Sequence, residues 1–220
     1  MKKCALISLI LPLACFLSCH LSAKEFKLIS LDDFGEIEQL KFQNQKGPQT
    51  LSIQKYFPNK SFTVPKGDVI HFYGVDPVTG ISAKIPLLRI SFDKQEGDTI
   101  VLLQKDENNS AQLNYEFLKN NPEAFPLLST NILNLSNKPV IAKLGDQLVK
   151  ILPKNKKLVP LPQNKNGTFN EKVVFAAQKE NQSIDYFYSS FWRVIAGHKT
   201  LCIIEPDEAA DTHKLVELLL

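Results

Sequence analysis

The sequence predicts an all-β protein made of two packed immunoglobulin-like β-sandwich lobes with a short C-terminal helix. Short apolar runs recur between turn residues at the spacing of about 8–12 residues that is typical of sandwiches. The stretch 131–162 shows this pattern most clearly, because Gly145-Asp146 and Pro153-Lys154-Asn155-Lys156 separate its apolar runs. Prolines and β-branched residues within it disfavour a helix. The two halves of the chain also share a plan, and each ends in an apolar strand, 99–104 and 199–204.

Residues 1–23 have the features of a secretory signal peptide. Lys2 and Lys3 precede an apolar run, and Leu21-Ser22-Ala23 ends in a small residue that suits cleavage before Lys24. An uncleaved anchor is the first alternative, but the run is short for the roughly 20 residues of a membrane span. A lipoprotein is the second alternative, with Cys15 or Cys19 as the modified residue, although the residues before them fit a lipidation signal poorly. We predict an exported protein, periplasmic or extracellular, with no transmembrane span in the mature chain.

The N-terminal lobe is expected to span residues 24–118. Apolar and polar residues alternate in its first strand, 25–31, and turn residues such as Pro65-Lys66-Gly67-Asp68 separate the strands that follow. The further strands are expected at 37–42, 51–56, 62–64, 69–74, 83–92, 99–104 and 113–118.

The C-terminal lobe is expected to span residues 119–206, after a connector over 119–126. Its strands are the runs within 131–162, followed by 173–177, 183–194 and 199–204. The tail 207–220 opens with Asp207-Glu208-Ala209-Ala210 and ends in leucines, which favours a short helix. One continuous larger sandwich is the alternative to two lobes.

Charge and cysteine content narrow the function classes. The chain has 26 Lys+Arg and 23 Asp+Glu, and removal of Lys2 and Lys3 with the signal leaves 24 against 23. This balance argues against nucleic-acid binding, which requires a clustered basic face. Cys202 is the one cysteine beyond the signal, so no intramolecular disulfide can form. Its apolar neighbours indicate a buried residue rather than a nucleophile.

No motif predicts catalysis, a cofactor or a metal site. His71, His198 and His213 lack the spacing of metal ligands, and the sequence has no GxSxG nucleophile motif. We therefore predict a protein that is not an enzyme. A hydrolase with an unrecognised site remains an alternative.

The aromatic segment Tyr186 to Trp192, within the strand predicted at 183–194, is the best candidate for a binding surface. Tyr186, Tyr188 and Trp192 would stack on a protein partner or a glycan if this strand lay at a sheet edge. The alternative is a strand buried on both faces that joins the lobes.

The C-terminal half resembles small exported bacterial β-sandwich proteins of unknown function. The matching markers are Asn134-Leu135-Ser136, Pro139-Val140, Gly145-Asp146, Pro153, Val159-Pro160, Trp192-Arg193 and Lys199-Thr200-Leu201. The resemblance covers about 75 residues, concerns the fold alone and supplies no functional residues. The function expected is that of a non-catalytic bacterial envelope protein, which interacts with another envelope protein or has a structural part. A carbohydrate-binding module that uses the aromatic strand is the alternative.

Overall fold

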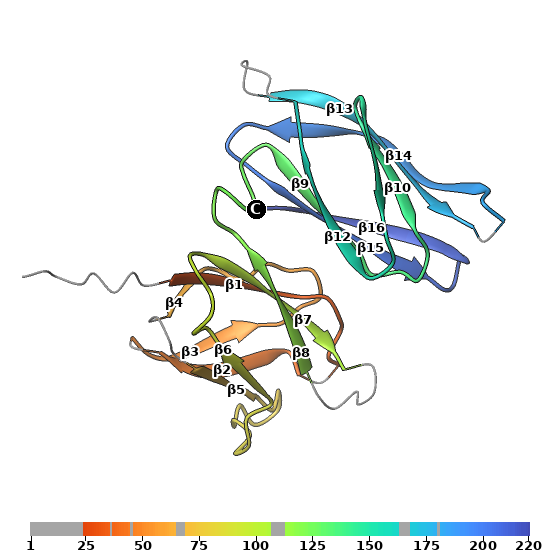
Figure 1. The fold of residues 1–220 in the computed structure, drawn as a ribbon. Coiled ribbons are helices and arrows are strands. Elements are labelled where there is room, and N and C mark those ends of the chain that lie inside the picture. The colour runs from red at the N-terminus through yellow and green to blue at the C-terminus, as the bar shows by residue number, and fades with distance from the viewer. Residues whose placement is uncertain are drawn as a thin grey trace, which may run out of the picture.

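The computed structural model describes residues 24–35, 37–44, 46–64, 69–106, 113–162, 168–179 and 181–220, so the predicted signal peptide lies outside the described residues. Sixteen strands form two lobes, which Figure 1 shows in colours from red to yellow-green and from green to blue. The N lobe contains β1 (Lys24–Ser30), β2 (Gln39–Asn44), β3 (Gly47–Ser52), β4 (Phe62–Val64), β5 (Val69–Gly74), β6 (Leu88–Ser91), β7 (Thr99–Lys105) and β8 (Leu113–Lys119). The C lobe contains β9 (Ser129–Asn134), β10 (Val140–Leu144), β11 (Gln147–Ile151), β12 (Asn155–Pro160), β13 (Thr168–Gln178), β14 (Ile184–Ile195), β15 (Thr200–Asp207) and β16 (Thr212–Leu219).

The two lobes repeat one topology. The N lobe has sheets of order β4-β1-β7-β8 and β3-β2-β5-β6, and the C lobe has sheets of order β12-β9-β15-β16 and β11-β10-β13-β14. Counted from the start of each lobe, these orders are identical. In both lobes the first strand also pairs in parallel with the seventh, β1 with β7 and β9 with β15. The similar plan seen in the sequence is therefore a repeat of the whole strand arrangement.

Individual backbone hydrogen bonds repeat as well. The N–H of Leu31 donates to the carbonyl of Leu103 after β1, and the N–H of Leu135 donates to Ile204 after β9. The parallel registers agree with this match, because Ser30 lies opposite Leu103 and Asn134 lies opposite Ile204. Ser30 and Asn134 therefore occupy equivalent positions.

The four sheets stack in layers with three apolar clusters between them. The first cluster lies within the N lobe, around Phe26 and Phe72, and the second lies within the C lobe, around Val173 and Phe175. The third lies between the lobes and contains Ile29, Leu31, Ile100, Leu102, Leu118, Phe125, Leu133, Leu201 and Ile203.

The strands beside the third cluster are buried on both faces. On β15, Leu201 and Ile203 face the other lobe, whereas Cys202 and Ile204 face the core of their own lobe. Strands covered on both faces are expected to be apolar without alternation. This explains the continuous apolar runs at 99–104 and 199–204.

The predicted C-terminal helix is wrong, since none of the described residues is helical. Residues 208–211 form a hairpin turn, in which Asp211 has a φ of 48°, and β16 then pairs with β15 over its whole length. Leu215 packs on the C-lobe core, whereas Val216 and Leu218 pack on the cluster between the lobes. The leucines that indicated a helix therefore lie on opposite faces of one strand and pack on two different apolar clusters.

Candidate functional site

The sheet β11-β10-β13-β14 has one face on the C-lobe core and one face in solvent. Val140, Ala142 and Leu144 of β10 point into the core, so the residues between them point outward. The same alternation holds on β11, where Ile151 faces the core, and on β13, where Val173 and Phe175 do. We call the solvent side the C-lobe outer face, and its residues are Ile141, Lys143, Leu148, Lys150, Thr168, Asn170, Lys172, Val174, Ala176, Gln178, Ile184, Tyr186, Ser189, Phe191, Arg193 and Ile195.

A β-bulge places the aromatic residues of β14 on this face. Phe175 lies opposite Tyr188 and Ala176 lies opposite Tyr186, which leaves Phe187 as the extra residue. Tyr186 and Phe191 are five positions apart, and regular alternation would put them on opposite faces. Because the bulge shifts the alternation by one residue, both are exposed, at 70% and 69%.

Three of the four cations of the C-lobe outer face lie opposite apolar side chains on neighbouring strands, whereas Arg193 lies opposite Asn170. Lys143 lies opposite Leu148, Lys150 opposite Ile141, and Lys172 opposite Phe191. Side chains directly opposite each other on neighbouring strands are about 5 Å apart. The face therefore presents a regular pattern of amines among apolar groups.

The same face of the N lobe is different. Its outward residues are Gln39, Lys41, Gln43, Pro48, Thr50, Ser52, Val69, His71, Tyr73, Arg89 and Ser91. Six of these eleven residues carry amides or hydroxyls, two are the cations Lys41 and Arg89, and Val69, the large apolar residue that reaches solvent, is only 37% exposed. Since the two lobes share one topology, the N-lobe face is an internal reference for a solvated sheet. The exposed aromatic residues of the C-lobe outer face are therefore not a requirement of the fold, and its four cations exceed the two of the N-lobe face.

The structure brings the three predicted contact residues onto β14 but exposes only one of them fully. Tyr186 is open to solvent, Tyr188 is partly buried, and Trp192 is 5% exposed. The indole Nε1 of Trp192 donates a hydrogen bond of 3.0 Å to the Tyr188 hydroxyl. Both rings pack on Phe175, with centroid distances of 5.8 Å for Trp192 and 6.0 Å for Tyr188. Their contact with a partner or a glycan stays a prediction.

The strand that carries them is at the edge of its sheet. Among the described strands β14 pairs only with β13, and it takes no part in the apolar cluster between the lobes. It is therefore not the strand that joins the lobes.

The histidines and the cysteine have ordinary structural surroundings. His71 and His198 are exposed, and His213 is buried with its ring 5.1 Å from that of Phe187. Cys202 is fully buried, and burial raises the pKa of its thiol well above the usual range. Within the described ranges, no three His, Cys, Asp or Glu side chains gather as metal ligands.

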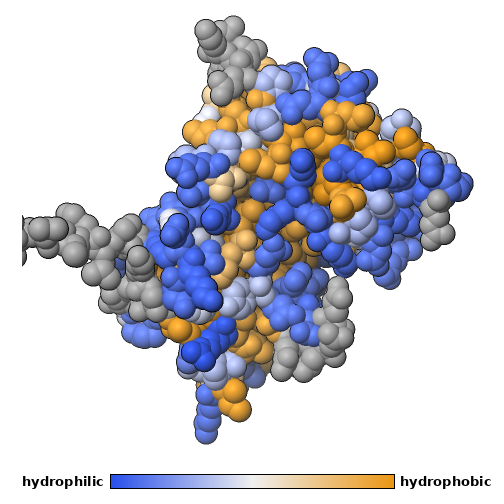
Figure 2. Space-filling view, viewed as in Figure 1, coloured by the Kyte–Doolittle hydropathy of each residue, from blue (hydrophilic) through white to orange (hydrophobic). Residues whose placement is uncertain are grey.

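A second exposed surface is the loop between β5 and β6. Val78, Ile81 and Ile85 are 91%, 68% and 79% exposed, and Figure 2 shows apolar side chains at this lower tip of the N lobe. The carboxylate of Asp76 holds the loop by accepting hydrogen bonds from the N–H groups of Val78 and Thr79, at 2.9 and 2.8 Å. The loop lines a cavity of about 510 Å³ together with Ile37 and Leu87.

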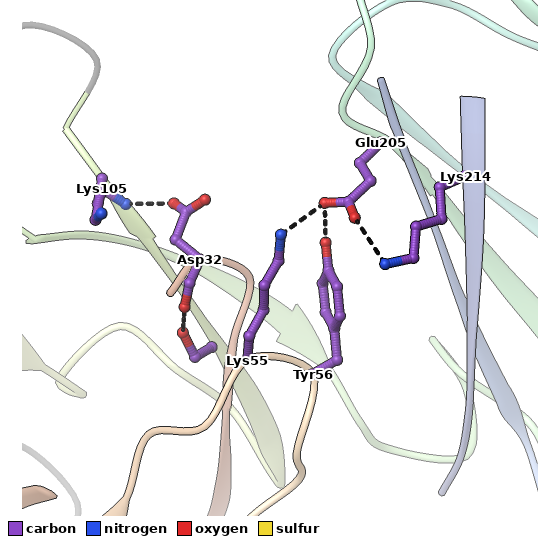
Figure 3. A network of polar contacts seen from close by, with 7 residues as sticks. Asp32, Lys55, Tyr56, Lys105, Glu205 and Lys214 are labelled. Atoms are coloured by element: carbon purple, nitrogen blue, oxygen red, sulfur yellow. Dashed lines mark hydrogen bonds and ion pairs between the residues drawn. The ribbon is translucent and has the colours of Figure 1, made fainter. Parts of the chain in front are cut away.

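A polar cluster joins the lobes at one end of their interface (Figure 3). The Tyr56 hydroxyl and the Lys55 amine both donate to Oε2 of Glu205, the amine at 2.9 Å, and Lys214 lies 3.8 Å from Oε1. Burial raises the pKa of Glu205, but the hydrogen bonds from Tyr56 and Lys55 outweigh it and hold the pKa below its ordinary value. Glu205 also lines a cavity of about 340 Å³ with residues of both lobes, among them Asp32 and Gln104. This cluster fastens the lobes to each other.

Sequence reasoning missed Phe191, Leu148 and the four cations of the C-lobe outer face. The Gly145-Asp146 turn could have placed Lys143 opposite Leu148, because a two-residue hairpin turn fixes the register. Lys172 and Phe191 come together only through the register of β13 with β14, and the bulge in that register left no signal in the sequence.

No protein-family model matches the chain, and no curated protein matches it. A DUF3823 family protein from Bacteroides ovatus is similar in structure, with 10% identity, a TM-score of 0.24, and coverage of 77% of this chain and 97% of that one. A Bacteroides uniformis protein provisionally described as a cell adhesion protein has 10% identity, a TM-score of 0.23, and coverage of 90% and 97%. In the part of the chain that the structure describes, no helix is long and apolar enough to cross a membrane.

Proposed function

We propose that this chain is an exported, non-catalytic protein of a bacterial envelope, which acts by protein–protein interaction through the C-lobe outer face. The observation that carries the proposal is the difference between the equivalent faces of the two lobes. One fold supports a polar face around Thr50 and Gln43 in the N lobe, and a face with exposed Tyr186 and Phe191 in the C lobe. Large aromatic side chains left in solvent without a structural need are typical of interaction surfaces.

The proposed location rests on the N-terminal sequence. Lys2 and Lys3, the apolar run after them and the small residue at Ala23 are features of a secretory signal. The mass of the mature protein tests this part. We expect a mass that corresponds to cleavage before Lys24. A mass that includes a lipid on Cys15 or Cys19 would instead identify a lipoprotein.

Site-specific photo-cross-linking tests the interaction surface. The full chain is expressed in its own cells with a benzophenone amino acid at position 191, and in a matched sample at position 57. Phe57 is an aromatic residue of the N lobe with 56% exposure, which makes it a suitable control. We expect a discrete protein adduct from position 191 and none from position 57. Equal adducts at both positions, or none at 191, would refute the proposal.

A substitution separates a specific contact from accidental proximity. Tyr186→Ser should reduce the adduct at position 191, because Tyr186 shares the face with Phe191, whereas Val78→Ser in the apolar loop of the N lobe should leave it unchanged. If Val78→Ser alone abolished the adduct, the binding surface would lie on the loop between β5 and β6.

Tyr186 also keeps the glycan alternative open, since it is the exposed ring of the predicted three. The chain has one tryptophan, Trp192, which donates to Tyr188 on the same strand. Its fluorescence therefore reports on β14. A glycan panel that changes this fluorescence, with the change lost in Tyr186→Ser, would favour the carbohydrate-binding function.

A further inference from the structure

The C-lobe outer face has a strongly one-sided charge. Its outward positions contain Lys143, Lys150, Lys172 and Arg193, and all four side chains are exposed. No outward position of this face is Asp or Glu within the described parts of these strands. The whole chain has 26 basic and 23 acidic residues, so this imbalance is local.

The nearest carboxylates lie beside the face rather than on it. Asp185 precedes the bulge, where the alternation is shifted, and it pairs with Lys179 at 3.2 Å. Glu171 of β13 has the same parity as the core residue Val173, and Asp146 lies in the turn after β10.

The cations of this face are available to a partner. Lys150 Nζ donates to the amide oxygen of Gln178 at 2.7 Å, which leaves its charge without a counterion in that contact. Lys143, Lys172 and Arg193 form no ion pair with another described residue. Like charges that gather without counterions repel each other, and a carboxylate partner would relieve this repulsion.

From this charge and from the cross-strand pairs described above, we infer that the C-lobe outer face binds an acidic protein surface, on which carboxylates alternate with apolar side chains. The inference rests on the proposed function and adds the chemistry of the partner. Charge complementarity carries it, because three of the four cations lie opposite Leu148, Ile141 and Phe191 on neighbouring strands. A partner with the complementary pattern would place a carboxylate against each cation and an apolar side chain against each apolar side chain of this face.

The size of the face indicates a transient complex. Four strands about 4.8 Å apart make it about 14 Å wide, and nine residue steps along β14 make it about 30 Å long. The projected area is on the order of 400 Å², at the lower end of what one partner contributes to a weak interface. Electrostatic steering would then contribute much of the association rate.

Binding of defined polymers tests the inference. The probes are a random copolymer of glutamate and tyrosine, a matched copolymer of lysine and tyrosine, polygalacturonate, and vesicles of phosphatidylglycerol. We expect the full chain to bind the glutamate copolymer best. We also expect this affinity to fall by about tenfold or more between about 0.05 M and about 0.5 M salt, since screening weakens contacts between exposed charges.

A triple variant of the C-lobe outer face and a double variant of the equivalent N-lobe face locate the site. Lys143→Gln with Lys172→Gln and Arg193→Gln should weaken the glutamate copolymer by roughly tenfold. Lys41→Gln with Arg89→Gln, on the equivalent N-lobe face, should change it little. Circular dichroism spectra of both variants show whether they remain folded.

Each other outcome overturns the inference in a recognisable way. Preference for polygalacturonate would identify a glycan site, and preference for the vesicles would identify a membrane-binding face. Binding of no anionic polymer, together with a persistent adduct at position 191, would leave the proposed function standing with a partner that is not acidic. Loss of the adduct as well would remove both proposals.

Discussion

The hydroxyl of Tyr56 in the N lobe donates a hydrogen bond to the carboxylate of Glu205 in the C lobe, and this contact fixes one end of the lobe interface. Glu205 is 15% exposed at its side chain and accepts a second bond from Lys55 on the same oxygen. Tyr56 itself has a φ of 61°, which is rare for a residue with a side chain. The backbone N–H of Tyr56 also donates to the carbonyl of Ser30 at 2.7 Å, at the end of β1. The hydrogen bond between Tyr56 and Glu205 is therefore held in place by β1, the strand that also contributes Ile29 to the apolar cluster between the lobes.

The Tyr56 contact predicts a stability change in alkali. Burial and the neighbouring Glu205 raise the pKa of Tyr56 above its ordinary value. A group with a raised folded-state pKa stabilises the protein below its unfolded pKa, about 10 for tyrosine, and the contribution is lost as pH rises further. Tyr56→Phe should lower the free energy of unfolding by about 1–2 kcal/mol at neutral pH. Above about pH 10, the free energy of unfolding should fall less steeply with pH in this variant than in the unmodified chain. Urea titrations at several pH values measure this, with Tyr73→Phe as the control, and parallel pH profiles for Tyr56→Phe and the unmodified chain would contradict it.

Glu205 predicts the opposite dependence in acid. Its pKa is lowered overall, so its contribution to stability is present above the unfolded pKa of about 4.3 and is lost as pH falls through the folded pKa. Glu205→Gln should destabilise the neutral protein and reduce the further loss below about pH 4. Glu116→Gln is the matched control, because Glu116 also pairs across the lobes, with Lys156, but is 48% exposed at its side chain. If both variants lost the same stability, the buried position of Glu205 would have no special role.

The buried side chain of Asn134 joins two turns of the stretch 131–162 by hydrogen bonds. Its amide nitrogen donates to the carbonyls of Lys138 and Leu152 at 2.9 and 3.1 Å, and its oxygen accepts from the hydroxyl of Ser136 at 2.8 Å. The side chain is fully buried. Asn134→Ala would remove all of these hydrogen bonds from a buried site and should cost about 1–3 kcal/mol of unfolding free energy. Thermal and urea unfolding measure this, and Asn155→Ala, an exposed position on β12, is the control. A loss of less than about 1 kcal/mol would mean that water replaces the amide.

Much of the fold was predictable because local chemistry decided it. Gly145-Asp146 and Pro153-Lys154-Asn155-Lys156 predicted turns from local chemistry alone. In the structure Gly145-Asp146 is the hairpin turn between β10 and β11, whereas Pro153-Lys154 is the turn by which the chain passes from β11 to β12 in the other sheet. The tail after Pro206 was mispredicted because Leu215, Val216 and Leu218 have the composition of a helix, and only the open edge of β15 decides for a strand. On the candidate site, the sequence singled out Tyr186 as a contact residue, but its place on the same face as Phe191 depends on the bulge at Phe187. Such tertiary contacts leave no mark in the local sequence.

The turn at Gly145 predicts a local strain effect. Gly145 has a φ of +57°, and a Cβ at this position would lie 2.5 Å from an oxygen of Glu171. Gly145→Ala should therefore destabilise the C lobe by about 1–2 kcal/mol, from the left-handed backbone and the displaced carboxylate. Gly35→Ala is a matched control, because Gly35 has a φ of +63° but no atom within 4 Å of the added Cβ. The excess cost at Gly145 measures the contact with Glu171, and equal costs would show that Glu171 moves aside freely.

Neighbouring isoleucines of β15 test whether the lobes stabilise each other. Ile203 faces the cluster between the lobes and Ile204 faces the C-lobe core, and both are fully buried. Each substitution by Ala should cost about 2–5 kcal/mol. Hydrogen exchange should separate them, because Ile203→Ala loosens the packing of the cluster that also contains Ile29 of β1 and Ile100 of β7, and should speed exchange in these two strands. Ile204→Ala should instead act mainly on β10 and β13. Identical exchange rates in the N lobe for the two variants would mean that the lobes unfold as one unit, wherever the cavity lies. Unchanged N-lobe exchange in Ile203→Ala would show that the N lobe is stable without the interface.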